Sequence, residues 1–587
     1  MRVDKSTTPD SIANTFADLY IKLYNRDSPH SLDDVVIKLN RRIRTENFTN
    51  LNSITNVEVD LAIRSLKPLK SDAFFDVSSN HYILARQVIV PTVTRIIKAL
   101  LVHGRLPAIL TICQFVPILK NRFGSRADSS NYRAIANGCL FLKIIELLLM
   151  RFEADHLKLS DLQFAYQEKV STTTCSWAVQ TVVNYFNRRA RPVYAASLNM
   201  TKAFDNVNWV KLMATLEERS VDPVFLRLMC SLYSSQECSV CWDGSISKRF
   251  SVTNGIRQGS VCSGLLFTIY IDCIIPAIKS SNIGCKIGSV FLGVMIYADD
   301  ILLLSASSKG LQAMLSICQQ HSSKLDLSFG TAKSLCVLFA KRKRRTPPPT
   351  MYLYGKPLPW TKGAKHLGVF LENNSSFTRD MSEKRLKFIG LCHSLIQEFP
   401  KGTPDLMMKL VNIYATGCLH SSQLWNFNCS QFTQLLRTWN KLIRRFYKLK
   451  FWTHRWLLSV LCKFTHLEGI LAGNFLGFVQ NLRSSEKPPI AFLYNVAIHD
   501  RRSDISSNLK WLQDKTKTDI NIILDFSAKQ LKADRIYQPI TTTVQHSVAA
   551  VVSELQQVLN DDSTISCMDK QDARSLFNHL CTTEEYY

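Results

Sequence analysis

Residues 293–305 are GVMIYADDILLLS, two apolar runs on either side of Ala298, Asp299 and Asp300. β-Branched and large apolar residues that flank polar turn residues are typical of strands, so this stretch predicts a β-hairpin with Asp299 and Asp300 at its turn. Two adjacent carboxylates repel each other, and burying them is costly unless a cation compensates for their charge. Mg²⁺ favours sites with one or two carboxylates. The stretch therefore predicts either a divalent metal site or an ordinary polar turn, since aspartate is common in turns.

The segments around this hairpin alternate between short strands and helices. Strands are expected at Val193–Met200, Ser239–Trp242, Ser289–Tyr297, Ile301–Ser305 and Ser334–Phe339, with helices between them at Trp209–Glu218, Leu265–Ile278 and Leu311–Leu325. Such an order is typical of an α+β domain whose antiparallel sheet packs on helices. Upstream, apolar periodicity predicts helices at Val57–Leu66, at Thr92–Leu101 after Pro91, and at Leu140–Phe152.

The chain changes character after residue 340. Lys341-Arg-Lys-Arg-Arg345 is followed by Thr346 and three prolines, which predict a linker or a hairpin tip. A nuclear localisation signal, a phosphate contact and a plain solvated loop all remain open for this basic run. A small β element is expected from Met351–Tyr354, a turn at Gly355–Pro357, and Leu367–Leu371. The following residues are expected to be helical and basic, and the last part helical with an acidic end.

Charge and cysteine usage favour a reduced, intracellular protein with a polyanionic partner. The 587 residues include 72 Lys and Arg against 47 Asp and Glu, a formal net charge of +25. Such a surplus favours nucleic acid because neutralised phosphates release condensed counterions. Among 17 cysteines only Cys238 and Cys241 form a C-x-x-C pair, expected on a hairpin that turns at Asp243-Gly244, and no partner pair stands at zinc-ligand spacing. The longest apolar stretch, Cys262–Ile278, contains a charged residue and predicts a buried helix rather than a membrane span.

Further short motifs accompany the hairpin in a fixed order. Asn254–Ser260 contains two glycines that permit close backbone approach, with Arg257 and Gln258 as donors. The other motifs are Lys67–Ser71, Ser78–His81, His103–Pro107, Val116–Lys120, Asn131–Ile135, Gln163–Tyr166 with Ser171-Thr172, Lys202–Asp205, Ser263 with Leu266-Phe267, Thr331–Ser334, His366–Val369, Lys384-Arg385 and Thr453–Arg455. Together these segments resemble the reverse transcriptase domain of non-LTR retrotransposons, in a lineage like the jockey and CR1 elements, over roughly residues 55–460.

This resemblance implies a right-hand polymerase fold of fingers, palm and thumb, followed by a helical C-terminal region. The implied parts are a lead-in at 1–54, fingers with part of the palm at 55–192, the palm at 193–345, a small β element at 346–375, a helical basic thumb at 376–480 and an unassigned helical region at 481–587. The implied reaction adds a deoxynucleotide to a primer 3′-OH with two Mg²⁺ ions. The implied partners are an RNA template, a DNA primer and deoxynucleoside triphosphates, without a membrane. Location in the nucleus or the cytoplasm and the oligomeric state both stay open.

The resemblance also implies roles for individual residues. Asp299 and Asp300 match the paired palm aspartates that hold metal, and Lys333 matches a lysine suited to protonating the pyrophosphate leaving group. The residues that match nucleotide-binding positions are Lys120, Arg133, Phe204, Gln258 and Gly259, of which Phe204 would block a ribose 2′-OH. The residues that match template or primer positions are Arg257, Gly255, Leu367 and Gly368.

The chain departs from the family pattern at a catalytic position. Asn199 stands where the family has a third aspartate that bridges both metals, and a neutral amide is a weaker ligand that cannot bridge in this way. We therefore expect impaired metal binding and transition-state stabilisation. Asp205, the acidic residue nearby, is expected to cap the helix that begins near Trp209 rather than to replace residue 199. The remaining departures are Ala73-Phe74 in a Gly-rich loop, Ala134 and Gly264 for proline, and Gly330 for asparagine.

Three interpretations remain open. The chain is an RNA-directed DNA polymerase weakened at Asn199, a non-catalytic nucleic-acid binder, or the product of an old element copy without a selected role. Complete elements of this type carry an endonuclease domain before the polymerase. The lead-in of about fifty residues is shorter than most domains, so we expect this chain not to nick its own target.

Overall fold

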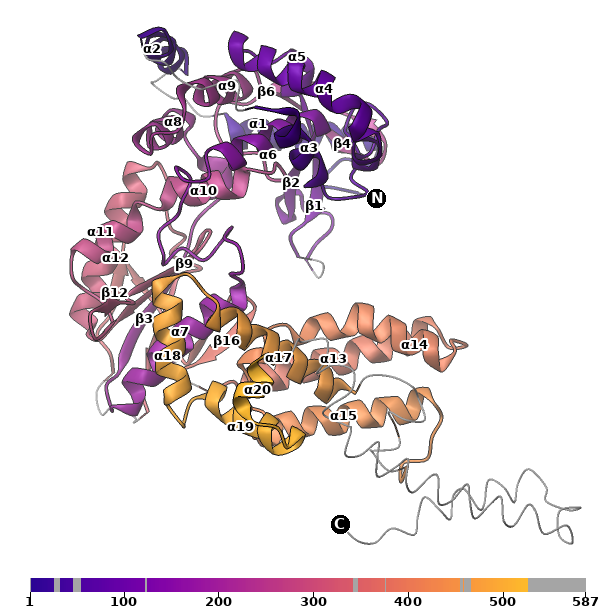
Figure 1. Cartoon of the computed structure of the whole chain (residues 1–587), viewed down its shortest axis with the longest axis vertical. Helices are drawn as coiled ribbons and strands as arrows, with labels where there is room; N and C mark the ends of the chain where they lie inside the picture. The colour runs from indigo at the N-terminus through magenta and orange to yellow at the C-terminus, as the bar shows by residue number, and fades with distance from the viewer. Residues whose placement is uncertain are drawn as a thin grey trace, which may run out of the picture. The chain divides into compact units, whose positions relative to one another are not determined.

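The computed structural model describes residues 2–25, 32–45, 54–121, 124–341, 347–374, 376–453, 458 and 466–525 (Figure 1). Contacts group the chain into two compact units, and each unit is made of separate stretches. Unit 1 comprises Met1–Val170, Tyr194–Cys336 and Thr346–Trp360, and unit 2 comprises Ser171–Val193, Val337–Arg345 and Thr361–Tyr587. The fold is α+β, as the sequence predicts, and the boundaries of the six expected parts stay predictions.

The predicted hairpin lies in a five-stranded sheet. Strands β9 (Val294–Tyr297) and β10 (Asp300–Ser305) pair antiparallel, with Asp300 opposite Tyr297. On its other edge β10 pairs antiparallel with β3 (Val193–Asn199). The sheet order is β14-β11-β3-β10-β9, in which β11 is Leu335–Phe339 and β14 is Trp360–Thr361. Five of the six residues of β10 are buried, so the apolar runs of the sequence form the interior of this sheet.

Helices α11 (Ile274–Ser280) and α12 (Ser308–Lys324) pack together beside this sheet, where α12 contacts β10 (Figure 1). The predicted single helix Leu265–Ile278 is wrong in one respect, because α10 (Ser263–Ile271) ends before Asp272 and α11 begins after Cys273. The Asp272 carboxylate holds the break in place by accepting hydrogen bonds from Ser160 and pairing with Arg219. Residues 263–280 are apolar enough to count as a membrane span by length and composition, but 67% of them are buried inside the protein, as in a core helix.

A second sheet of unit 1 has the order β2-β1-β4-β5, and β6 (Phe250–Ser251) also pairs with β4. Its strands are β1 (Cys113–Leu119), β2 (Tyr132–Gly138), β4 (Glu237–Trp242) and β5 (Ser245–Ile246). The β4–β5 hairpin turns at Asp243-Gly244, which confirms the prediction for the strand that carries Cys238 and Cys241.

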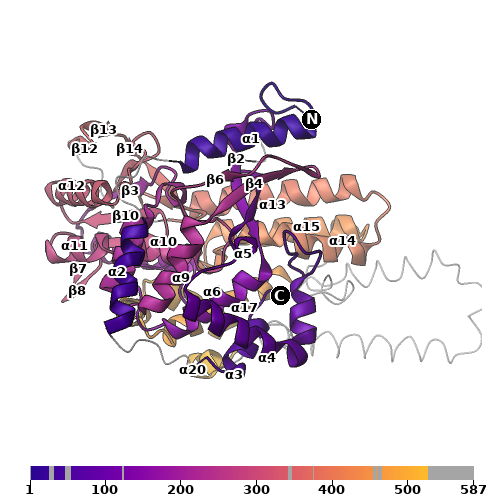
Figure 2. The ribbon, with the colours of Figure 1, turned by 90° about the horizontal axis from the view of Figure 1, so that it is seen from above.

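The N-terminal helix α1 (Pro9–Tyr24) packs onto this second sheet (Figure 2). It begins with a capping box between Thr8 and Ser11 and buries Phe16, Tyr20 and Tyr24, which recur every four residues and share one helix face. These rings contact those of Phe115, Tyr132 and Trp242 at centroid distances of 5.1 to 5.6 Å. Helix α1 is therefore part of the hydrophobic core of unit 1.

The remaining helices of unit 1 test the upstream predictions. They are α2 (Leu32–Thr45), α3 (Asn56–Arg64), α4 (Ser79–His103), α5 (Ala108–Thr111), α6 (Leu140–Phe152), α8 (Trp209–Glu218) and α9 (Pro223–Ser234). The bounds of α6 and α8 confirm the prediction to the residue. The start predicted for α4 at Thr92 is wrong, since a capping box between Ser78 and His81 starts the helix much earlier. Pro91 lies inside α4 without ending it, because buried residues on one face hold the helix on both sides of the proline.

Short hairpins complete unit 1. They are β7 (Lys286–Ile287) with β8 (Val290–Phe291), and β12 (Met351–Leu353) with β13 (Lys356–Leu358). The turn expected at Gly355–Pro357 is shifted by one residue. It consists of Tyr354 and Gly355, both with positive φ, which is the two-residue turn that matches the twist of a hairpin.

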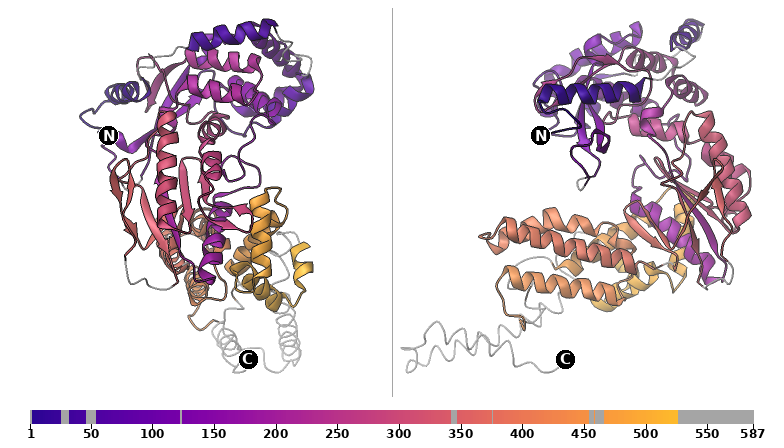
Figure 3. Two further views of the ribbon diagram at one scale, coloured as in Figure 1. Left: turned by 90° about the vertical axis from the view of Figure 1, so that its left-hand side faces the viewer. Right: turned by 180° about the vertical axis from the view of Figure 1, so that it is seen from behind.

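In its described residues, unit 2 is mostly helical and has one hairpin. Its helices are α7 (Thr172–Arg188), α13 (Thr378–Glu398), α14 (Pro404–Leu410), α15 (Ser430–Phe446), α17 (Leu467–Arg483), α18 (Pro488–His499), α19 (Asp504–Thr516) and α20 (Ile520–Asp525). Helices α13 and α15 lie side by side (Figure 3). The hairpin is β15 (Gly363–His366) with β16 (Val369–Glu372), so the strand expected from Leu367 starts two residues later, after the turn.

A buried ion pair ties the start of α13 to the rest of unit 2. Asp380 and Lys384 are 3.0 Å apart, and their side chains are only 4% and 11% exposed. The Asp380 carboxylate also accepts hydrogen bonds from the indole N–H of Trp425 at 2.9 Å and from the Phe370 backbone N–H at 3.0 Å. One carboxylate thus connects α13, the β16 strand and the segment around Trp425.

Several predicted features lie outside the described residues. They are the basic run at 342–345, positions 454 and 455 of the last motif, and the C-terminal region from 526 onward.

Candidate functional site

The Asp299 and Asp300 carboxylates are held at the β9–β10 turn by a buried glutamine. Ala298 has a positive φ of 53°, and its backbone N–H donates to the Gln163 side-chain oxygen at 3.2 Å. Burial raises the pKa of Asp299, which the charge of Arg133 partly offsets. Burial, and then the charge of Asp299, raise the pKa of Asp300 to about 6. The turn therefore holds two partly buried carboxylates whose ionised forms need a positive partner.

Asn199 lies on the neighbouring strand β3, directly opposite Asp300. Its Cα is the register partner of Asp300, and its side chain forms a hydrogen bond that lowers the pKa of the Asp300 carboxyl. Its backbone binds the segment before β11, since its carbonyl accepts from Gly330 N–H at 2.8 Å. The structure therefore brings Asn199, Asp299 and Asp300 together, as predicted, with an amide where a third carboxylate was expected from the family pattern.

Lys120 and three further cationic side chains form a cluster, and one of these, Arg133, also lies within electrostatic reach of Asp299. Lys120 follows β1, Arg133 is on β2, Lys202 is in the turn after β3, and Lys333 precedes β11. Burial lowers the pKa of Lys120, and repulsion from the other three cations lowers it further, so each of these three lies within electrostatic reach of Lys120. Three of these were predicted as site residues. Lys202 was missed because its motif was interpreted through its neighbours Phe204 and Asp205, although its charge stood in the sequence.

Asp205 does not cap α8, which corrects the expectation from sequence. Asn208 is the N-cap, and its side-chain oxygen accepts from Lys211 N–H at 3.2 Å. Asp205 lies in the short helical turn η3 (Phe204–Asn206), three residues too early to reach the free N–H groups of α8. Its Oδ1 instead accepts from the Tyr24 hydroxyl at 2.7 Å and from the Gln258 amide at 3.0 Å. Burial raises the pKa of Asp205, and both hydrogen bonds oppose that shift.

The glycine-containing segment 254–260 lies close to other backbone. A Cβ at Gly259 would come within 2.5 Å of the Ala136 carbonyl oxygen, and φ is +128° there, so this position requires glycine. Arg257 is only 5% exposed and donates to the Gln236 side chain at 3.0 Å and to the Thr111 carbonyl. Its guanidinium is therefore bound inside unit 1, whereas its role at the template stays a prediction.

Phe204 has its ring half-buried and stacked on Phe267, with centroids 4.5 Å apart. This stacking fixes the orientation of the Phe204 ring beside the sheet that carries Asp299 and Asp300. The ring of Tyr166 lies where a side chain at Gly264 would stand, 2.0 Å from an added Cβ. A proline at position 264 would therefore displace Tyr166, whose pKa is raised by burial and by the nearby Tyr297 and Asp299.

The other two predicted site residues, Leu367 and Gly368, form the β15–β16 turn of unit 2, both with positive φ. The preceding His366 is 3% exposed, and burial lowers its pKa to about 4, so its ring is neutral. The role of Leu367 and Gly368 at the template or primer stays a prediction.

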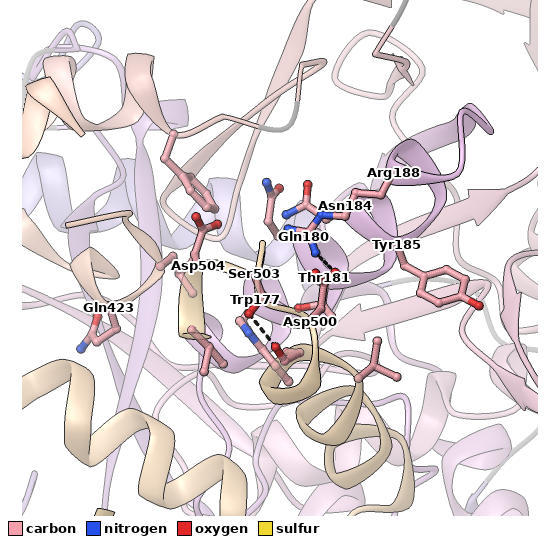
Figure 4. A pocket seen from close by; sticks show the side chains of 15 residues that line it. Trp177, Gln180, Thr181, Asn184, Tyr185, Arg188, Gln423, Asp500, Ser503 and Asp504 are labelled. Atoms are coloured by element: carbon pink, nitrogen blue, oxygen red, sulfur yellow. Dashed lines mark hydrogen bonds and ion pairs between the residues drawn. The ribbon is translucent and has the colours of Figure 1, made fainter. Parts of the chain in front are cut away.

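A small pocket of unit 2 does not resemble an active site. It is a cavity of about 40 Å³ lined by α7 and the α18–α19 connection, and Arg188 in it pairs with Asp500 (Figure 4). Asp504, whose pKa burial raises, accepts from Asn426 at 3.0 Å. The volume suits one or two water molecules. Since Arg188 pairs with Asp500 and Asp504 is hydrogen-bonded to Asn426, the polar groups of this pocket connect the helices around it.

The donor set at the hairpin fits one divalent cation. Asp299 and Asp300 supply two hard carboxylate ligands, and Asn199 beside them is neutral. Among the described residues, no three His, Cys, Asp or Glu side chains lie close enough together to hold a metal ion. A second ion would therefore have to rely on the amide of Asn199 and on substrate oxygens.

Metal binding at this site should depend on pH. Cation affinity is expected to rise as pH increases through about 6, the pKa of Asp300 in the metal-free protein, and then to level off. The stability of the metal-free protein should change in the opposite direction. It should fall as pH rises from 3.8, the ordinary pKa of the carboxyl, to about 6, because the folded state binds this proton more tightly than the unfolded state. Calorimetric titration with Mn²⁺ across this range measures the first effect. Asp300→Asn is the control, and an affinity that stays constant with pH in the native chain would contradict the assignment.

Comparison with known proteins finds a family model that matches this part of the chain. Residues 118–391 match the family model described as reverse transcriptase (RNA-dependent DNA polymerase). This match includes all the predicted site residues.

The chain is also similar to proteins of transposable elements. The chain is 24% identical over 231 residues to a Pol polyprotein from a type-2 retrotransposable element of Drosophila melanogaster, which covers 39% of this chain and 22% of that protein. It is 22% identical over 375 residues to an uncharacterized 149 kDa protein of transposon TX1 from Xenopus laevis, covering 62% and 28%. It is 29% identical over 203 residues to the RNA-directed DNA polymerase from the mobile element jockey of Drosophila funebris, covering 33% and 21%. The matched part spans less than a third of each of these relatives.

Proposed function

The chain carries a reverse transcriptase domain related to those of non-LTR retrotransposons, and on this premise we propose that it is an RNA-directed DNA polymerase limited by Asn199. The domain implies the palm, fingers and thumb of a polymerase. One observation carries the proposal: Asp300 pairs in register with Asn199, and Asp299 lies within electrostatic reach of Arg133, which belongs to the cation cluster around Lys120. Carboxylates for metal beside cations for phosphate are the charges that phosphoryl transfer requires.

The proposed roles pair each charged side chain with a group of opposite charge. Asp299 and Asp300 would hold Mg²⁺, which would supply positive charge to stabilise the attacking and leaving oxygens. Lys120, Arg133 and Lys202 would neutralise the triphosphate. The primer 3′-hydroxyl would release its proton to solvent water as its oxygen forms a bond to the α-phosphorus. The bond to the pyrophosphate oxygen would break, and Lys333 would donate a proton to that leaving group.

Two further roles concern the choice of substrate. The stacked ring of Phe204 would exclude a ribose 2′-OH and so favour deoxynucleotides. The proposed substrates are an RNA template with a DNA primer and deoxynucleoside triphosphates, and the proposed location is nuclear or cytoplasmic.

A specific observation favours a second candidate function, a non-catalytic binder of primer–template. The Asn199 side chain already gives Asp300 a hydrogen bond, so this carboxylate has a partner in the absence of metal. With a net charge of +25 and the cation cluster, the chain would still bind the phosphates of a nucleic acid.

Primer extension on an RNA template tests the proposal. The full chain is expected to bind the primer–template in a salt-sensitive manner and to add deoxynucleotides slowly, because one of the three family carboxylates is an amide. An Asp299→Asn/Asp300→Asn double variant should keep the binding and lose the addition. Binding without addition by the native chain would support the second candidate. Neither binding nor addition would leave both functions without support and favour a product with no selected role.

A further inference from the structure

The last turn of α1 is fixed to the segment that contains Gln258. The Tyr24 carbonyl accepts hydrogen bonds from the backbone N–H groups of Thr253 at 2.9 Å and Asn254 at 3.1 Å. The Tyr24 ring is 3% exposed and stacks on Phe115, with centroids 5.3 Å apart and planes at 16°. A Cβ at Gly255, where φ is +86°, would lie 2.8 Å from this ring. Glycine therefore permits the segment to pass directly over Tyr24.

The same tyrosine contacts the site through its hydroxyl. The Tyr24 O–H and the Gln258 amide N–H both donate to Oδ1 of Asp205. One carboxylate oxygen thus connects a helix from the start of the chain to a side chain that the family places against template and nucleotide.

Backbone bonds join the two segments that this carboxylate connects. Asn254 donates its side-chain amide to the Asp205 carbonyl at 2.6 Å, and Ile256 N–H donates to the Phe204 carbonyl at 2.9 Å. The backbones around Asp205 and Gln258 are therefore fixed relative to each other. The orientation of the Gln258 side chain then depends on its hydrogen bond to the Asp205 carboxylate.

We propose that Tyr24 is a positioning residue, which holds the Asp205 carboxylate ionised and oriented so that it fixes the amide of Gln258 for nucleotide binding. This inference rests on the proposed polymerase function. The charged and titratable groups around Asp205 are Tyr20, Tyr24, Lys120 and Lys202, and the two lysines favour its ionised form. If Asp205 were protonated, it would offer Gln258 a weaker acceptor.

Tyr24→Phe removes only the hydroxyl and keeps the packed ring. The KM for the incoming deoxynucleotide is expected to rise about fivefold or more with kcat changed less than about twofold, since a hydrogen bond to a charged group is lost. Without that bond the pKa of Asp205 rises further, so the increase in KM should become larger as pH falls. Tyr20→Phe is the matched control, because the Tyr20 hydroxyl is buried on the same helix without a hydrogen-bond partner among the described residues.

An Asp205→Asn background tests whether the effect of Tyr24→Phe depends on the charge of Asp205. There Tyr24→Phe should leave the pH dependence of KM unchanged, because the amide does not titrate in this range. An unchanged KM in Tyr24→Phe, or the same pH-dependent effect in the Asp205→Asn background, would overturn the proposal.

A second readout does not depend on polymerase activity. If neither the native chain nor its Asn199→Asp variant extends a primer, the polymerase proposal fails and the kinetic test lapses. Amide hydrogen exchange of residues 253–260 then decides, measured with primer–template and a deoxynucleoside triphosphate. Nucleotide-induced protection of this segment that is lost in Tyr24→Phe and kept in Tyr20→Phe would support the positioning role. Equal protection in all three chains would overturn it.

Discussion

Asn199→Asp is expected to raise the rate of primer extension by about 100-fold to 1,000-fold. The substitution places a third carboxylate directly opposite Asp300 in the β3–β10 register, where a bridging metal ligand can form. Interactions aimed at charge that develops in the transition state typically contribute rate factors of this size. Single-nucleotide addition in the presence of Mg²⁺ measures the effect.

Two control variants separate ligand geometry from charge. Asn199→Ala removes the amide without adding a carboxylate and should not increase the rate. The double variant Asn199→Asp/Asp300→Asn has the same net charge as the native chain but lacks the adjacent pair, so it too should stay slow. If the native chain extends as fast as Asn199→Asp, the assignment of Asn199 as the limiting residue is wrong.

The same substitution should make stability more dependent on metal. A third carboxylate beside two that are already partly buried adds repulsion when no cation is present. The melting temperature of Asn199→Asp should therefore be lower than that of the native chain in a chelator and should rise more on addition of Mg²⁺.

Asp380→Ala is expected to lower the free energy of unfolding of unit 2 by about 3–5 kcal/mol. The change leaves the Lys384 ammonium buried without its counter-charge and removes the acceptor of both the Trp425 indole and the Phe370 N–H. Breaking one side of a buried pair costs more than the pair itself contributes, because the remaining charge stays desolvated. Urea unfolding followed by tryptophan fluorescence measures the shift.

Glu383→Ala provides the matched control on the same helix. Glu383 pairs with Arg379 at 2.7 Å, but both side chains are more than half exposed. An exposed pair of this kind contributes about 0–1 kcal/mol, so the urea midpoint should hardly move. A loss in Asp380→Ala as small as that in Glu383→Ala would show that the buried pair is not a main support of unit 2.

Local signals in the sequence predicted the elements around the carboxylates well. The 293–305 hairpin and helices α6 and α8 follow from apolar runs and from polar turn or cap residues within a few positions. The prediction that a helix starts after Pro91 was wrong because it also relied on a local signal. Proline is a local stop signal, and the buried face of α4 overrides it.

The contacts that complete the site are not local. Tyr24 and Asp205 are 181 positions apart in the sequence, and no turn or cap signal connects them. Without that contact, Asp205 was assigned to the nearest helix start. The aromatic residues that recur every four positions at Phe16, Tyr20 and Tyr24 did carry a signal, since such a stripe predicts a helix face that packs on a core.

The discontinuous make-up of unit 2 has a consequence for synthesis on the ribosome. Helix α7 buries most of its residues, and Trp177 on it packs against Phe478, about three hundred residues later in the chain. At about 5–20 residues per second, the ribosome completes that stretch in about 15–60 seconds. Throughout this interval α7 carries an apolar surface whose partners do not yet exist. The nascent chain therefore offers a binding site to chaperones well before unit 2 can close around this helix.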